Sequence, residues 1–193
     1  GLRCAERFGC RTIRLDATPL GRPLYEKMGF RPQFEISRWA GTPRLDAAAR
    51  GSAPARARTS AELAAIAAMD RAATRTDRAL LLRRLAAESA PWIAQDGDGR
   101  VRAFLFSRPG RVARLIGPGC GDAGRLRSLL RHALAHHAGR PVFLDLPADR
   151  ADLSGIAREA GLEVARGFLR MCRGREVIED SSLFHVSSGP ELG

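Results

Sequence analysis

Tyr25 is the only tyrosine among the 193 residues, and its phenol could take part in a reaction. It lies in the run Leu24-Tyr25-Glu26-Lys27-Met28-Gly29-Phe30. A phenol can donate a proton to a leaving group. The same ring can instead pack inward from an amphipathic helix while its hydroxyl finds a partner. Taken without any further pattern, the residue types favour the packing role.

A second group is the glycine pattern G-x-G-x-x-G at 119–124. A dinucleotide site needs a ribose-binding acid and a strand–turn–helix setting, but the strands before this run are predicted to form a meander. Pro118 also removes a backbone donor. Asp122 is predicted to cap the next helix, where its carboxylate would compete with a phosphate. Gly119 and Gly121 are therefore candidate cofactor-binding residues, with a helix end capped by Asp122 and closed to phosphate as the alternative.

Two further sets of polar residues could do chemistry. His132 and His136 lie about one helical turn apart, a spacing suited to metal binding, but no third ligand is evident. We therefore expect exposed histidines on an outer helix face and predict no metal. Asp145, at a strand end, and His185, in the last apolar stretch, form an acid/base pair if the fold brings them together.

The elements that must position these residues follow from apolar periodicity and turn residues. Expected strands are 11–16, 30–39, 91–95, 100–107, 111–116, 142–146 and 163–172, with an apolar stretch at 183–186. Expected helices are 18–29, 61–69, 77–87, 122–138 and 151–160. Thr18 and Pro19 are expected to start the first helix, with Leu20, Leu24 and Met28 on one face. A hairpin turn is expected at 96–99, and a glycine-rich loop at 117–121.

This order predicts an α+β or α/β layered fold, with a mixed sheet flanked by helices. The stretch 40–60 is rich in Gly, Pro, Ala and Arg without an apolar period, which indicates a linker. The sequence therefore divides into residues 1–41, a linker at 42–60, and a second domain at 61–193.

The composition limits the possible functions. The formal net charge is +11, yet there is one lysine and the arginines are dispersed, so nucleic-acid binding is not favoured. No apolar run is long enough to predict a membrane-spanning helix. Four dispersed cysteines without a C-x-x-C pair are typical of free thiols in a reducing cytoplasm.

A strand–helix–strand pattern occurs twice. The first repeat unit, 13–41, and the second repeat unit, 142–174, share four features. Each has a strand ending in Leu-Asp, a helix closed by glycine, an apolar residue, and a strand that contains arginine. Because simple βαβ units share parts of this pattern, chance similarity is the alternative.

The run from Leu15 to Phe30, with its Leu-Tyr-Glu-Lys-x-Gly-Phe core, resembles the late strand and last helix of GNAT acetyltransferases. In that family the preceding strand and helix carry a Gln/Arg-x-x-Gly-x-Gly/Ala loop, which holds the pyrophosphate of acetyl-CoA on backbone N–H groups. The tyrosine of the last helix often protonates the departing thiolate. The resemblance therefore implies that Tyr25 is the catalytic acid.

The part from Ala61 onward resembles the GNAT-like C-terminal domain that follows a complete acetyltransferase domain in one bacterial family. It departs from the GNAT pattern at two places. Ala157 stands four residues before Gly161, where Tyr25 stands four before Gly29. The loop at 115–121 has no Gln or Arg where the phosphate motif begins. These departures predict a degenerate second copy.

The resemblance implies an N-acetyltransferase with acetyl-CoA as cosubstrate and a small-molecule or peptidyl amine as acceptor. The chain would be the C-terminal part of a tandem protein, because Gly1 falls near the end of the helix that follows the first phosphate loop. A non-catalytic GNAT-like module that binds a substrate or partner is the alternative. The acceptor, the general base and the oligomeric state stay open.

Overall fold

The computed structural model describes residues 2–45 and 53–190. Its helices are α1 (Leu2–Arg7), α2 (Arg22–Lys27), α3 (Ser60–Thr74), α4 (Ala79–Glu88), α5 (Ala123–His136) and α6 (Ala151–Glu159). Its strands are β1 (Thr12–Ala17), β2 (Arg31–Gly41), β3 (Ala55–Arg56), β4 (Trp92–Gln95), β5 (Val101–Arg108), β6 (Arg114–Gly121), β7 (Val142–Pro147), β8 (Glu163–Gly174) and β9 (Phe184–Val186).

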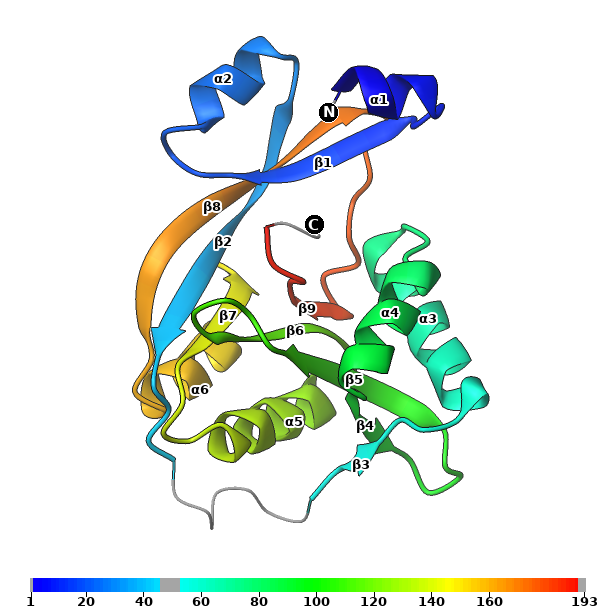
Figure 1. Ribbon diagram of the computed structural model, residues 1–193, viewed down its shortest axis with the longest axis vertical. Coiled ribbons are helices and arrows are strands. Elements are labelled where there is room, and N and C mark those ends of the chain that lie inside the picture. The colour runs from blue at the N-terminus through cyan, green and yellow to red at the C-terminus, as the bar shows by residue number, and fades with distance from the viewer. Residues whose placement is uncertain (1, 46–52, 191–193) are drawn as a thin grey trace.

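The strands form a single mixed sheet in the order β1-β8-β2-β7-β6-β5-β4-β3, and β9 pairs with β6 outside this path (Figure 1). Most neighbours are antiparallel, whereas β6 and β7 are parallel. The predicted mixed sheet flanked by helices is confirmed.

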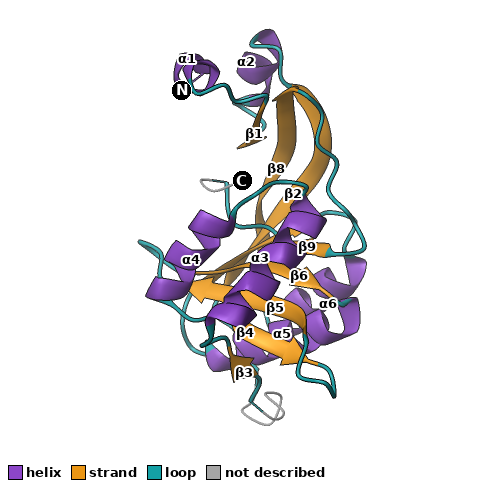
Figure 2. Cartoon of the chain, turned by 90° about the vertical axis from the view of Figure 1, so that its right-hand side faces the viewer, coloured by secondary structure: helices purple, strands orange, loops and turns teal. Residues whose placement is uncertain are grey.

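Two helix layers cover the lower part of the sheet, as the two views show (Figures 1 and 2). Helices α5 and α6 pack with Leu105 and Leu144 in one core cluster. Helices α3 and α4 pack with Phe104 and Phe106 in another. Because consecutive residues of β5 point to opposite faces, the two clusters lie on opposite sides of the sheet.

The N-terminal segment is built into the same sheet as the rest of the chain. Strand β2 lies between β7 and β8 and pairs antiparallel with both. Strand β1 pairs with the far edge of β8. Each repeat unit therefore places its last strand beside the first strand of the other unit. The domain limits at 41 and 61 stay predictions, but hydrogen bonds of one sheet connect the two sides of the linker.

Some element boundaries differ from those expected. Helix α2 begins at Arg22, because Thr18 and Pro19 open a turn in which the Gly21 N–H donates to the Thr18 carbonyl. Residues 117–121 are not a loop, since β6 runs through to its end at Gly121. Within the expected linker, β3 pairs with β4, whereas residues 46–52 lie outside the described part.

Candidate functional site

Tyr25 lies on the short helix α2 and is half-buried. Its ring meets Phe30 edge-on, with centroids 5.7 Å apart. It packs at the margin of a small cluster formed by Ala17, Phe30 and Met171. The packing role considered for this tyrosine is therefore real, and it leaves part of the side chain accessible to a reacting partner.

The predicted apolar face of α2 points to solvent. Leu20 is 95 % exposed, Leu24 is 59 % exposed and Met28 is 38 % exposed. A helix whose apolar stripe stays uncovered gains little from tertiary packing. In this chain α2 therefore presents both its phenol and its apolar side chains at the surface.

The candidate cofactor glycines, Gly119 and Gly121, lie in β6 and are buried. A Cβ on Gly121 would stand 2.3 Å from the Arg102 carbonyl oxygen, and one on Gly119 would stand 2.7 Å from Leu105 Cδ1. The backbone contact excludes a side chain at Gly121, whereas at Gly119 the end of the Leu105 side chain would have to move. Close packing of β6 therefore explains the glycine at 121 and favours the one at 119, and the role of both in cofactor binding stays a prediction.

Backbone donors at the start of α5 already have partners. The Gly121 N–H donates to the Leu183 carbonyl and the Asp122 N–H to the Arg102 carbonyl. The predicted Asp122 cap is confirmed, since its carboxylate accepts the Arg125 N–H at 2.9 Å. That bond holds the pKa of Asp122 below its usual range, so the carboxylate stays charged. A negative charge here disfavours a phosphate at the same helix end.

The C-terminal segment fills the gap where β6 and β7 separate. The two strands pair only as far as Ile116 and Leu144, after which they diverge. Strand β9 then pairs with β6, and the Ser187 N–H donates to the Asp145 carbonyl of β7 at 2.9 Å. A Cβ on Gly117 would stand 2.1 Å from the Ser187 carbonyl oxygen. The chain itself thus occupies the space between these strands.

Two buried ion pairs link the repeat units in the same way. Asp16 of β1 accepts from Arg170 of β8, and Asp145 of β7 accepts both Nε and Nη2 of Arg38 of β2, at 2.8 and 2.7 Å. The two arginines each stand nine residues after the glycine that closes their helix. The repeated Leu-Asp and strand arginine were the sequence signal for these pairs, although the pairing between units was not foreseen.

The central strand pairing follows the same symmetry. Ile36 of β2 pairs with Phe168 of β8, and each of these residues stands seven positions after its glycine. Equivalent positions therefore face each other, as a pseudo-twofold axis through this pair requires. This axis relates the strands of the two units. It does not describe the packing around their helices.

The helix histidines differ in exposure. His136 is exposed as expected, whereas His132 and the neighbouring His137 are buried, because both pack edge-on against Trp92. Among the described residues, no group of three or more potential ligands is placed to hold a metal. His137 Nε2 lies 2.7 Å from Ser107 Oγ. Burial, followed by nearby Arg114, lowers the pKa of His137 to about 3.

Asp145 and His185 do not form an acid/base pair. The Asp145 carboxylate is held by Arg38, whereas His185 Nε2 bonds the Gly121 carbonyl oxygen at 2.9 Å. Burial lowers the pKa of His185, so the ring is neutral and donates from Nε2 to this oxygen. His185 therefore anchors β9 to the end of β6.

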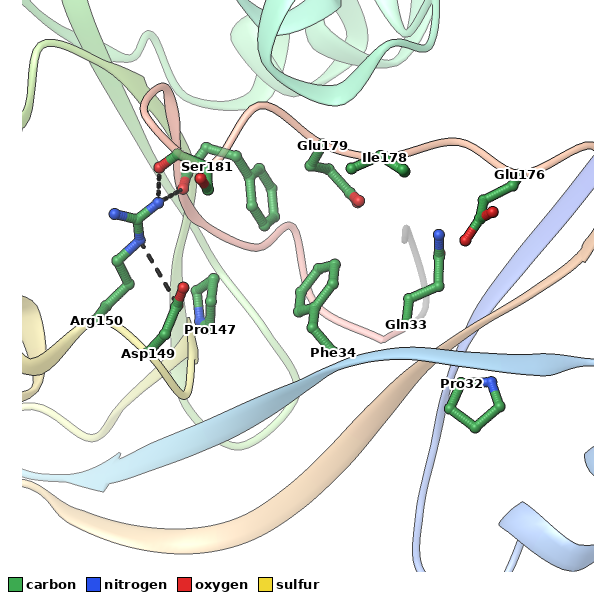
Figure 3. Close-up of a pocket in the computed structure, with 11 residues that line it drawn as sticks. Pro32, Gln33, Phe34, Pro147, Asp149, Arg150, Glu176, Ile178, Glu179 and Ser181 are labelled. Atoms are coloured by element: carbon green, nitrogen blue, oxygen red, sulfur yellow. Dashed lines mark hydrogen bonds and ion pairs between the residues drawn. The ribbon is translucent and has the colours of Figure 1, made fainter.

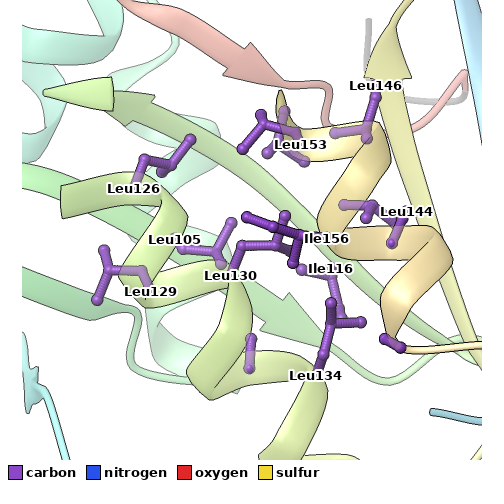
Figure 4. Close-up of a cluster of buried hydrophobic side chains, with 14 of the residues drawn as sticks. Leu105, Ile116, Leu126, Leu129, Leu130, Leu134, Leu144, Leu146, Leu153 and Ile156 are labelled. Atoms are coloured by element: carbon purple, nitrogen blue, oxygen red, sulfur yellow. The ribbon is translucent and has the colours of Figure 1, made fainter. Parts of the chain in front are cut away.

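In the second repeat unit the position equivalent to Tyr25 is closed. Ala157 of α6 is 0 % exposed and belongs to the core cluster shared with α5. Figure 4 shows its neighbours Leu153 and Ile156 directed into that cluster beside Leu130. There is no space here for a phenol, so α6 cannot reproduce the surface that α2 presents.

The second part of the chain matches a known protein family. A family profile described as "Acetyltransferase (GNAT) domain" matches residues 66–184, which is more than half of the chain. The chain belongs to the GNAT acetyltransferase domain family. This GNAT match covers the meander, α5, β7, α6 and β8, and it ends within β9.

Solved GNAT structures share the fold at low sequence identity. A Pyrococcus horikoshii protein to which an acetyltransferase function is attributed is 21 % identical with a TM-score of 0.73, over 97 % of this chain and 63 % of that one. A GCN5-related N-acetyltransferase from Sphaerobacter thermophilus is 18 % identical with a TM-score of 0.57, over 89 % of this chain and 62 % of that one. A GCN5-related N-acetyltransferase from Anabaena variabilis is 13 % identical with a TM-score of 0.56, over 89 % of this chain and 48 % of that one.

This GNAT chain thus spans less than two thirds of the length of these three neighbours. No curated protein gives a significant match to it. Among the described helices, none has the length and apolar character needed to cross a membrane.

Proposed function

We propose that the chain is the C-terminal part of an acetyl-CoA-dependent N-acetyltransferase in which the first repeat unit supplies the acid and the second gives support. The observation that carries the proposal is the contrast between Tyr25, half-buried on a solvent-facing helix, and Ala157, sealed in the core. The exposed Leu20 and Leu24 add support, because the rest of a first GNAT domain would cover them.

The chemistry assigned to Tyr25 is the protonation step. The neutral acceptor amine attacks the thioester carbonyl carbon, a C–N bond forms, and the C–S bond then breaks. The phenol of Tyr25 gives its proton to the departing CoA thiolate, while the amine loses a proton to a base or to water. The acceptor is a small-molecule or peptidyl amine.

A second proposal concerns residues 61–193, which we infer to be a non-catalytic GNAT domain in this protein. Three observations favour it. Strand β9 fills the gap between β6 and β7, the Gly121 N–H already donates to the Leu183 carbonyl, and the charged Asp122 carboxylate at the start of α5 would repel a phosphate.

A reducing, cytoplasmic setting suits the cysteines, which are free in the described part of the chain.

Calorimetry with acetyl-CoA tests both proposals. The present chain should not bind acetyl-CoA, whereas the natural polypeptide extended at its N-terminus should bind it. In the extended protein, Tyr25→Phe should lower kcat about 10²- to 10⁴-fold with KM unchanged, because only proton transfer is lost. Ala157→Ser is the matched control in the second unit and should leave kcat unchanged. Tight binding of acetyl-CoA by the present chain would contradict the division of roles.

A further inference from the structure

A pocket outside the regions discussed above lies between β2, the start of α6 and the segment that follows β8 (Figure 3). Its volume is about 360 Å³, enough for a small organic molecule. Phe34 rises from β2 into the pocket and meets Phe184 of β9, which also lines it. The pocket is therefore bounded by three segments that lie far apart in the sequence.

A buried hydrogen-bond acceptor in the wall has no partner. Gln33 donates from Nε2 to the Val177 carbonyl at 2.7 Å, which fixes the orientation of its amide. Its Oε1 atom is buried and makes no hydrogen bond within the described part of the chain. A buried acceptor without a donor is costly, and such atoms are rare in folded proteins. Gln33 lines the pocket, so a ligand that displaces the atoms covering this oxygen and donates a hydrogen bond would satisfy it.

The ionisable groups of the wall are mostly acidic, although the chain as a whole carries +11. Asp149, Glu176 and Glu179 line the pocket together with one base, Arg150. Arg150 is turned away, since its Nη2 donates to the carbonyls of Ser181 and Phe184.

Not all three carboxylates are available. Glu179 is neutralised by Arg14 and Arg170, which both donate to its Oε1. Asp149 lies 3.9 Å from Arg150 Nε and is only weakly compensated. Glu176 is exposed, and Figure 3 draws its carboxylate beside the Gln33 amide. The charge offered to a ligand is therefore negative, from Glu176 at the Gln33 end of the pocket and from Asp149 at the Pro147 end.

The opposite wall is aromatic. The rings of Phe34 and Phe184 meet edge-on with centroids 6.2 Å apart. The Arg170 guanidinium carbon lies 5.5 Å from the centroid of Phe34, so this ring already accommodates one cation. Aromatic faces attract organic cations, and they also hold an apolar body by burial.

We propose that this pocket binds an organic cation: a primary amine attached to a small apolar group. The ammonium donates to Gln33 Oε1 and is balanced by Glu176, while the apolar group lies against Phe34 and Phe184. The binding needs neither acetyl-CoA nor Tyr25, so it stands or falls independently of the proposed acetyl transfer.

The test is calorimetry on the present chain with three probes of one shape, in the absence of acetyl-CoA. We expect 2-phenylethylamine to bind, 2-phenylethanol to bind at least roughly tenfold more weakly, and phenylacetate not to bind, because the negative wall selects charge. Equal binding of the amine and the alcohol, or no binding of the amine at millimolar concentration, would overturn the proposal.

Variants place the probe in the pocket. Glu176→Gln should weaken amine binding roughly fivefold, as expected for a partly exposed charge pair, without disturbing the fold. Glu163→Gln, an exposed acid at the start of β8 outside the pocket, is the matched control and should leave affinity unchanged. Phe34→Leu, which keeps an apolar side chain, should weaken the amine more than the alcohol. Amine affinity unchanged in Glu176→Gln and Phe34→Leu would put the binding elsewhere and overturn the assignment.

Discussion

The two strand–helix–strand units of this molecule share one backbone plan and differ in what covers their helices. Strands β1 and β2 are related to β7 and β8 by the pseudo-twofold axis through Ile36 and Phe168. Helix α6 packs beside α5 and has buried residues along one face, whereas no residue of α2 is buried. The four strands of the two units are therefore symmetric, and the helices that follow their first strands are not.

The comparison separates parts that maintain the fold from a part free to do chemistry. The symmetric features are the strand pairing and the pairs Asp16–Arg170 and Asp145–Arg38, all of which join one unit to the other. The asymmetric feature is the residue four positions before the closing glycine, Tyr25 in one unit and Ala157 in the other. A duplicated unit can keep its sheet contacts while one helix specialises in packing.

The largest expected effect tests the symmetric pairs. Arg170→Leu should cost about 3–5 kcal/mol in the free energy of unfolding, because the buried Asp16 and Glu179 carboxylates lose their shared cation. Arg38→Leu should cost less, about 2 kcal/mol, since the Arg38 side chain is 16 % exposed and water can reach the site. Urea unfolding at neutral pH measures both values.

The informative result is which substitution lowers the free energy of unfolding more. Equal losses would mean that burial does not distinguish the two ion pairs. A larger loss for Arg38→Leu would contradict the expectation that the more buried pair matters more. A double variant reports whether the two pairs act independently, as sites without shared partners do.

The next effect tests the asymmetric position. Ala157→Tyr should destabilise the chain by roughly 3 kcal/mol or more, because a phenol must displace side chains of the core under α5. The reciprocal change, Tyr25→Ala, should cost only about 1 kcal/mol, since the ring is half-buried at a small cluster. Thermal unfolding of the two variants checks this. A tolerated tyrosine at 157 would show that the second helix could still carry the acid.

Much of the fold was predictable because each element carries a local signal. Alternating apolar residues predicted the strands, and the closing glycines Gly29 and Gly161 marked both helix ends. The place of β2 between β7 and β8 was not predictable, because pairing between distant strands depends on the whole sheet and not on local pattern. The misplaced start of α2 has a simpler cause: Thr18 and Pro19 suit a turn as well as a helix cap.

The site was predictable in part. The motif around Tyr25 predicts a catalytic acid, which stays a prediction, and the departure at Ala157 correctly indicated that the second helix differs from the first. The role of Gly119 as a packing residue was hidden, because a glycine required by close packing looks the same in sequence as a glycine required by a ligand. The pocket beside Gln33 was hidden for a related reason: its walls are far apart in sequence.

The smallest expected effect concerns pH and comes from a buried histidine next to α5, outside both repeat units. All four histidines follow residue 61, and none lies in either unit, 13–41 or 142–174. Burial depresses the pKa of His137 to about 3, below its ordinary value of about 6.5 in the unfolded chain. The unfolded state therefore binds the proton first as pH falls. The stability that neutral His137 contributes is fully present above about pH 6.5 and is lost progressively as pH falls toward 3.

Between pH 7 and pH 5 this one group should remove about 2 kcal/mol from the free energy of unfolding. His137→Gln keeps a polar partner for Ser107 and does not titrate, so its unfolding free energy should change by about 2 kcal/mol less over this range. Urea unfolding at both pH values provides the measurement, and Glu163→Gln is a control that should retain the full change. If His137→Gln loses as much stability as the unaltered chain, the buried imidazole is not what makes this chain sensitive to acid.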